Sequence, residues 1–159
     1  MSFGGVIKLQ GESAYRKAIK NINQSMRVLG SELKKAASEF SRNDKSVENL
    51  TAQNKILNKN VDEQKKKIAT LKGALEDAKK EYGEDSSQVK NWQTQLNNAE
   101  AQLNKLNRQV EENEKDIKAA NAETAKAKTP YETLSRTIKE QEQKLAELKT
   151  AYKNATLES

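Results

Sequence analysis

The sequence predicts an all-α protein built from long heptad-repeat, coiled-coil helices. Only 34% of the 159 residues are hydrophobic and 33% are charged, which is too little apolar material for a large globular core. Apolar residues nevertheless recur in alternating steps of three and four, the spacing of one helix face. A single proline and six glycines leave long stretches uninterrupted. This periodicity favours long helices over a disordered chain.

Composition also limits the chemistry that we expect. The chain has no cysteine and no histidine, so it lacks the usual general base and the commonest transition-metal ligands. Neighbouring carboxylates such as Glu84-Asp85 and Glu111-Glu112 do not have the spacing of a calcium loop or of an acid-base pair. We therefore expect no enzyme activity, no cofactor, no metal and no small-molecule substrate. No apolar run has the length of a signal-peptide core or of a transmembrane helix.

The chain divides into a short arm and four helical segments. In the arm, Val6-Ile7-Lys8-Leu9 lies between glycines and predicts an extended strand that either pairs with a partner's sheet edge or frays. The predicted segments are an extended arm over 1–11, a basic amphipathic helix over 12–42, and coiled-coil helices over 44–82, 86–128 and 130–157.

Three interruptions separate the predicted helices. Asn43-Asp44 ends the first helix. Gly83 favours a left-handed helix end, and Asp85 is suited to cap the next helix with Gln88 three residues on. In Thr129-Pro130-Tyr131-Glu132, a threonine N-cap, a proline at the first helical position and a glutamate closing a capping box predict the start of the last helix.

One heptad repeat continues across all three interruptions without a change of phase. Independent helices joined by loops have no reason to keep phase, so this continuity favours an extended rod of parallel helices. We expect a homo-oligomer, a dimer or a trimer, and the mixture of residues on the seam leaves the number of strands open. The predicted oligomer seam consists of Ile19, Ile22, Met26, Leu29, Leu33, Phe40, Val47, Leu50, Leu57, Val61, Ile68, Leu71, Leu75, Val89, Trp92, Leu96, Leu103, Leu106, Val110, Ile117, Leu134, Ile138, Leu145 and Leu148.

An antiparallel helical hairpin that turns near Gly83 is the alternative. Gly83 lies midway between two segments of similar length. A parallel rod in register brings Lys67 against Lys72, whereas the hairpin brings Lys72 near Glu100. Exposed charge pairs contribute only tenths of a kcal/mol, so both arrangements stay open for the isolated chain.

Positive charge is concentrated at the amino-terminal end. Residues 1–43 hold eight Lys or Arg and three Asp or Glu. A solvated helix face is the favoured interpretation. The alternative is a binder of membrane surfaces or nucleic acid that acts through residues 12–42, with Arg16, Lys17, Lys34 and Lys35 as its contacts.

Several blocks outside the heptad positions resemble the amino-terminal region of phage tail tape measure proteins from phages or prophages of Gram-positive bacteria. The resemblance covers residues 7 to about 120 and is also carried by the sequence around Tyr82-Gly83-Glu84-Asp85-Ser86 and the helix after Trp92. Its most specific blocks are Ile7-Lys8-Leu9-Gln10-Gly11-Glu12-Ser13-Ala14-Tyr15, Val28-Leu29-Gly30-Ser31-Glu32-Leu33-Lys34 and Asn43-Asp44-Lys45-Ser46-Val47-Glu48-Asn49-Leu50-Thr51-Ala52-Gln53-Asn54.

The resemblance implies a structural protein of the phage tail. Proteins of that family form an oligomeric rod in the lumen of the tail tube, set tail length and template tail assembly, with tail tube protein and tail assembly chaperones as partners. The implied location is the tail lumen of the virion, after synthesis in the cytoplasm of the host bacterium. Family members are usually much longer, so we expect this chain to be an amino-terminal fragment. The alternative function is a cytosolic coiled-coil module that tethers interaction partners.

Overall fold

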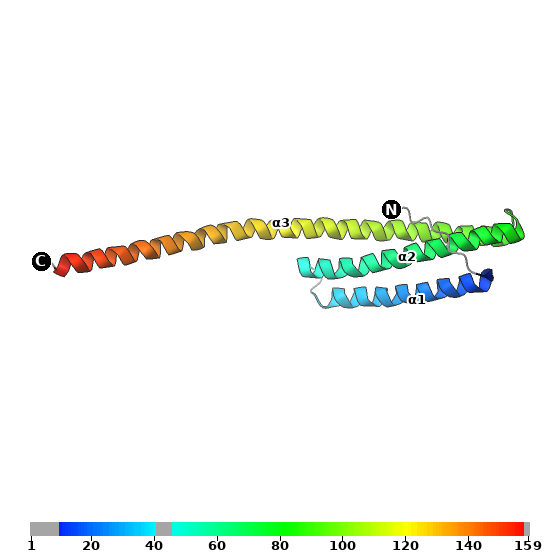
Figure 1. Cartoon of the computed structure of the whole chain (residues 1–159), viewed down its shortest axis with the longest axis horizontal. Coiled ribbons are helices and arrows are strands. Elements are labelled where there is room, and N and C mark those ends of the chain that lie inside the picture. The colour runs from blue at the N-terminus through cyan, green and yellow to red at the C-terminus, as the bar shows by residue number, and fades with distance from the viewer. Residues whose placement is uncertain (1–9, 41–45, 158–159) are drawn as a thin grey trace. The chain divides into compact units, whose positions relative to one another are not determined.

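The computed structural model describes residues 10–40 and 46–157 and contains three helices, with no strand in those ranges (Figure 1). They are α1 (Gly11–Ser38), α2 (Val47–Tyr82) and α3 (Ser87–Leu157). The predicted all-α class is therefore confirmed. Most of the predicted extended arm and the interruption at Asn43-Asp44 lie outside the described residues. The chain divides into two compact units, unit 1 (Met1–Ile117) and unit 2 (Lys118–Ser159).

The chain reverses direction after α2 at Gly83. This residue has φ 81° and ψ 158°, a conformation that only glycine adopts readily. Its amide donates a hydrogen bond to the Lys79 carbonyl at 3.1 Å. The cap of α3 differs from our prediction: the Ser86 hydroxyl, rather than the Asp85 carboxylate, accepts the hydrogen bond from the Val89 amide at 3.3 Å. A hydroxyl at this position satisfies one of the free amides of the first helical turn.

Within unit 1, α2 and the first part of α3 run antiparallel. The Gln64 side chain donates to the backbone carbonyl of Ala99 at 2.6 Å, and Lys72 lies 4.0 Å from Glu100. This is the ion pair expected of the hairpin. The hairpin is therefore the arrangement of residues 47–117 in the single chain, and the parallel rod remains a prediction about association between chains.

Helix α1 packs against both arms of the hairpin. The Tyr15 hydroxyl donates to Asp77 Oδ2 on α2 at 2.6 Å, and the Arg16 guanidinium lies 5.1 Å from the centre of the Trp92 ring on α3. Because α1 covers a second face of α2, α2 also buries residues that lie outside the predicted seam. One core joins the three helices and contains Tyr15, Ile19, Ile68, Leu71, Ala74, Leu75, Ala78, Val89, Trp92, Leu96 and Ala99.

The predicted helix start at Thr129 is absent, because α3 continues through Pro130. The Thr129 hydroxyl donates to the Ala125 carbonyl at 3.2 Å, within the helix, instead of capping a new one. Lys128 and Glu132 form an ion pair at 3.5 Å across the same turn. Proline inside a helix removes one backbone hydrogen bond and costs about 3 kcal/mol. The capping-box pattern was outweighed here by continuous helix on both sides.

Candidate interaction surfaces

The predicted seam residues fall into three groups in the structure. Buried within the described chain are Ile19, Leu29, Leu50, Leu57, Val61, Ile68, Leu71, Leu75, Val89, Trp92 and Leu96. Half-buried are Ile22, Met26, Leu33, Phe40, Val47, Leu103, Leu106, Val110 and Ile117. Exposed are Leu134, Ile138, Leu145 and Leu148. The buried residues pack within one chain, so among the seam residues in the described ranges the last group is the most exposed.

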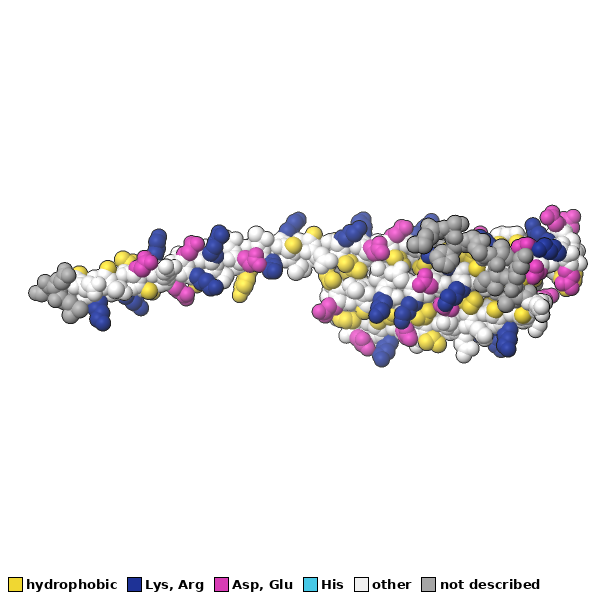
Figure 2. Space-filling view, viewed as in Figure 1, with side chains coloured by type: hydrophobic (Ala, Val, Ile, Leu, Met, Phe, Trp, Pro, Cys, Tyr) yellow, Lys and Arg dark blue, Asp and Glu magenta, His cyan; other side chains and the backbone are white. Residues whose placement is uncertain are grey.

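The four exposed seam residues, together with two tyrosines at the same heptad spacing, form what we call the C-terminal stripe: Tyr131, Leu134, Ile138, Leu145, Leu148 and Tyr152. These side chains are 47% to 74% exposed. They recur at the heptad spacing, with Gln141 as the polar residue between Ile138 and Leu145. Figure 2 shows apolar side chains at the surface of α3 in unit 2. A single helix that leaves its apolar face in water is only marginally stable, so the stripe is a candidate interface with another helix.

A second surface is a groove between α1 and α3 in unit 1, which we call the basic groove. It has a volume of about 460 Å³. A smaller hollow of about 200 Å³ shares Arg16 and Trp92 with it and reaches Ser87 at the start of α3. The residues that line the basic groove are Arg16, Ile19, Lys20, Asn23, Gln24, Arg27, Trp92 and Gln95.

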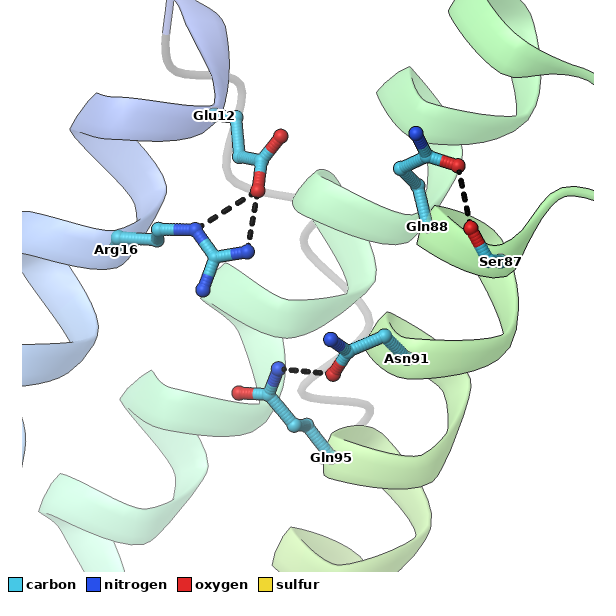
Figure 3. Close-up of polar contacts among 6 residues, drawn as sticks. All are labelled: Glu12, Arg16, Ser87, Gln88, Asn91 and Gln95. Carbon is cyan, nitrogen blue, oxygen red and sulfur yellow. Dashed lines mark hydrogen bonds and ion pairs between the residues drawn. The ribbon is translucent and has the colours of Figure 1, made fainter.

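The lining of the basic groove carries three cations and no carboxylate. Arg16 is bound to Glu12 through both Nε and Nη2, one turn earlier on α1 (Figure 3). On the facing helix, Gln95 donates to Asn91 Oδ1 at 2.9 Å. Trp92 is only 3% exposed, so it forms the floor of the groove and presents little ring surface. The groove therefore offers charge and amide groups rather than an apolar pocket.

Sequence reasoning named Arg16 as a possible contact of an anionic partner but not Lys20 or Arg27. Their spacing from Arg16, four and eleven residues, was available as a signal because it places all three on one helix face. By contrast, Lys17 and Lys34 are exposed on α1 but do not line the groove. A subset of the basic residues of α1 therefore lines the groove.

Ionisable groups with shifted pKa values occur on α2 and outside the basic groove. Partial burial lowers the pKa of Lys67. The hydrogen bond that Lys66 donates to Glu63 raises the pKa of Lys66, and the one that Lys80 donates to Glu76 raises the pKa of Lys80. These pairs follow the ordinary spacing of charges on one helix and indicate no acid-base chemistry.

No group of acidic side chains in residues 10–40 and 46–157 is arranged to hold a metal ion. Across the same ranges, none of the helices has a segment apolar and long enough for a membrane span. Comparison of the chain with protein-family models, with curated proteins and with solved structures yields no match. Functional inference for this chain therefore depends on its own residues and on the resemblance carried by its sequence blocks.

Proposed function

We propose that this chain is a structural protein of a phage tail, part of an oligomeric helical rod in the tail-tube lumen that sets tail length and templates tail assembly. The observation that carries the structural part of this proposal is the C-terminal stripe, an apolar heptad face without a partner in the described chain. The tail itself, with tail tube protein and assembly chaperones as partners, is inferred from the resemblance of residues 7 to about 120.

The occupant that best fits the stripe is the same segment of a second copy. Tyr131, Ile138, Leu145 and Tyr152 occupy one heptad position, while Leu134 and Leu148 occupy the companion position. Two such stripes supply each other with knobs and holes along their whole length. In a parallel pair, Glu123 of one copy faces Lys128 of the other, which is attractive, whereas Lys144 faces Lys149, which is repulsive.

The size of the stripe indicates how tight the association is. Full burial of one large apolar side chain contributes about 1.5–3 kcal/mol. The stripe residues are already partly covered by their own helix, so six of them contribute on the order of 5–10 kcal/mol per chain. Association itself costs about 4–15 kcal/mol in lost freedom of motion. We therefore expect oligomers whose population depends on concentration.

Light scattering combined with small-angle X-ray scattering tests the oligomer. The wild-type chain should gain mass with concentration, and Ile138→Asp with Leu145→Asp should leave it monomeric. Gln143→Asp with Thr150→Asp is the matched control, because it adds the same charge at outward heptad positions. A wild-type chain that stays monomeric at all concentrations contradicts the oligomer.

The role in the tail needs a separate test. Genes for a tail tube protein and for tail assembly chaperones should flank the gene for this chain. In a phage that carries it, deletion of whole heptads should shorten the tail by about 1.5 Å per residue removed, because a helix converts residue number into length at a constant rise. An unchanged tail length, or a gene without such neighbours, favours the cytosolic tethering module instead.

A further inference from the structure

We propose that the basic groove between α1 and α3 binds an acidic helical segment of a protein partner. This inference concerns unit 1 and does not depend on association through the C-terminal stripe. It begins from the arrangement of charge: Arg16, Lys20 and Arg27 line one hollow, and no Asp or Glu lines it with them. Arg16 is paired with Glu12 beside the hollow, so Lys20 and Arg27 are the cations that the groove offers to a partner.

The spacing of the three cations matches the repeat of a second helix. Residues 16, 20 and 27 are separated by four and then seven positions, and together they extend about 16 Å along α1. A helix laid along the groove presents carboxylates at the same intervals when its acidic residues are four and seven apart. A helix in this position adds one helix to the bundle and is held by its charged and polar side chains.

Neutral groups in the lining suit a peptide partner as well. Asn23 and Gln24 on α1 and Gln95 on α3 line the same hollow. Amide side chains both donate and accept hydrogen bonds. They therefore suit the mixed polar side chains on the flank of an acidic helix, while the cations pair with its carboxylates.

Single-stranded nucleic acid fits this groove less well. Proteins that bind single strands usually combine positive charge with exposed aromatic rings on which bases stack. Trp92 is the aromatic residue in the lining. It is 3% exposed and lies beneath the Arg16 guanidinium, so the groove has charge without a stacking surface.

A membrane surface is also disfavoured. Peripheral helices bind bilayers by inserting exposed apolar side chains next to their basic residues. The aliphatic residue in the groove, Ile19, is 7% exposed and belongs to the core. The cations therefore have no apolar anchor beside them, and their position in a recess suits a narrow ligand such as a helix.

The test uses the full chain and fluorescence anisotropy at low salt. The probe is a labelled synthetic helical peptide with glutamates four and seven residues apart, and a peptide of the same composition in scrambled order is its control. Lys20→Gln with Arg27→Gln should weaken binding of the probe about five-fold or more, whereas Lys17→Gln with Lys34→Gln should change it less than two-fold. Both double variants remove two charges from α1, and Arg16 is kept because it packs on Trp92.

A charge reversal sharpens the test. Lys20→Glu with Arg27→Glu should reject the acidic probe and bind the same helix with lysines in place of the glutamates. Circular dichroism reports whether each variant keeps its helical content, and Arg27→Gln alone replaces the double variant if that one unfolds. Oligothymidine and phosphatidylserine vesicles, measured in parallel, should bind more weakly than the acidic helix.

Three results overturn the proposal. The first is the absence of saturable binding of the acidic helix by the wild-type chain at low salt. The second is equal weakening by the two Gln double variants, which means that the total charge of α1 and not the groove attracts the probe. The third is tighter binding of oligothymidine or vesicles with the same dependence on Lys20 and Arg27, which assigns the groove to nucleic acid or to lipid.

Discussion

The hairpin in unit 1 brings Lys72 and Glu100 of one chain close together, whereas a parallel rod holds them far apart. Lys72 and Glu100 form an ion pair at 4.0 Å. In one continuous helix the 28 residues between them (100 − 72) correspond to about 42 Å. The ion pair itself contributes only about 0.2–1 kcal/mol because both side chains are partly exposed. Replacement of both residues by cysteine should therefore leave the fold intact while it places a reactive pair across the hairpin.

The chain has no cysteine of its own, so every cross-link in the variant Lys72→Cys with Glu100→Cys reports this pair. At low protein concentration, a short bismaleimide should join residues 72 and 100 of the same chain, and mass spectrometry of the digest identifies the linked peptides. Lys72→Cys with Lys128→Cys is the control and should give no such loop. Cross-links that occur only between chains, joining residue 72 to residue 72, would refute the hairpin and support a parallel rod in register.

Three further changes test individual contacts by chemical denaturation, circular dichroism or both. Tyr15→Phe removes a hydroxyl that donates a hydrogen bond to Asp77 at 2.6 Å. It should lower the free energy of unfolding of unit 1 by about 1.5–3 kcal/mol, the usual contribution of a hydrogen bond to a charged group. An unchanged free energy would mean that α1 is not docked through this contact. Pro130→Ala restores the backbone hydrogen bond missing from α3. It should raise the helical content of unit 2 and stabilise the helix by up to about 3 kcal/mol. Unchanged helical content would indicate a helix start at Thr129. Burial lowers the pKa of Lys67, so at this residue the unfolded state binds more protons just below pH 10.5, and the contribution of Lys67 to stability rises with pH in that range. Lys67→Met should therefore make the slope of stability against pH less positive than in the wild-type chain, and an unchanged slope would rule out this contribution.

Heptad spacing predicted which apolar residues are buried in α2 and early α3 but not what covers them. Ile68 and Leu71 lie in the core as their seam positions require. The side chains of Thr70 and Ala74 are also buried, although neither lies on the seam, because α1 packs on a second face of α2. Small or weakly polar residues give no periodic signal, so the sequence could not indicate that second face. Tyr15 was within reach of prediction, since it lies one heptad before Ile22.

The choice between hairpin and rod depended on features that sequence patterns weigh poorly. The backbone of Gly83 adopts its turn conformation at little cost, but a glycine at a helix end is equally compatible with a joint in a rod. Gln64 is polar and on the seam, which weakens either arrangement. In the hairpin it is 1% exposed and reaches the backbone carbonyl of Ala99, because the alanine side chain is small enough to let it approach. Such pairing of a large polar residue with a small one becomes visible only when the two arms are aligned.

The continuous heptad phase now has a simpler cause over part of the chain. Thr129-Pro130 does not interrupt α3, so the phase shared by Val89 and Ile138 follows from one uninterrupted helix and needs no parallel rod. Along residues 89–99 this seam packs on α2, and Leu71, Leu75, Val89, Trp92 and Leu96 lie in one core. Along 131–152 the same heptad positions are exposed in the described chain. Burial of these positions requires another helix that packs on the C-terminal stripe, as α2 packs on the start of α3. A second copy of the stripe has apolar residues at the required spacing.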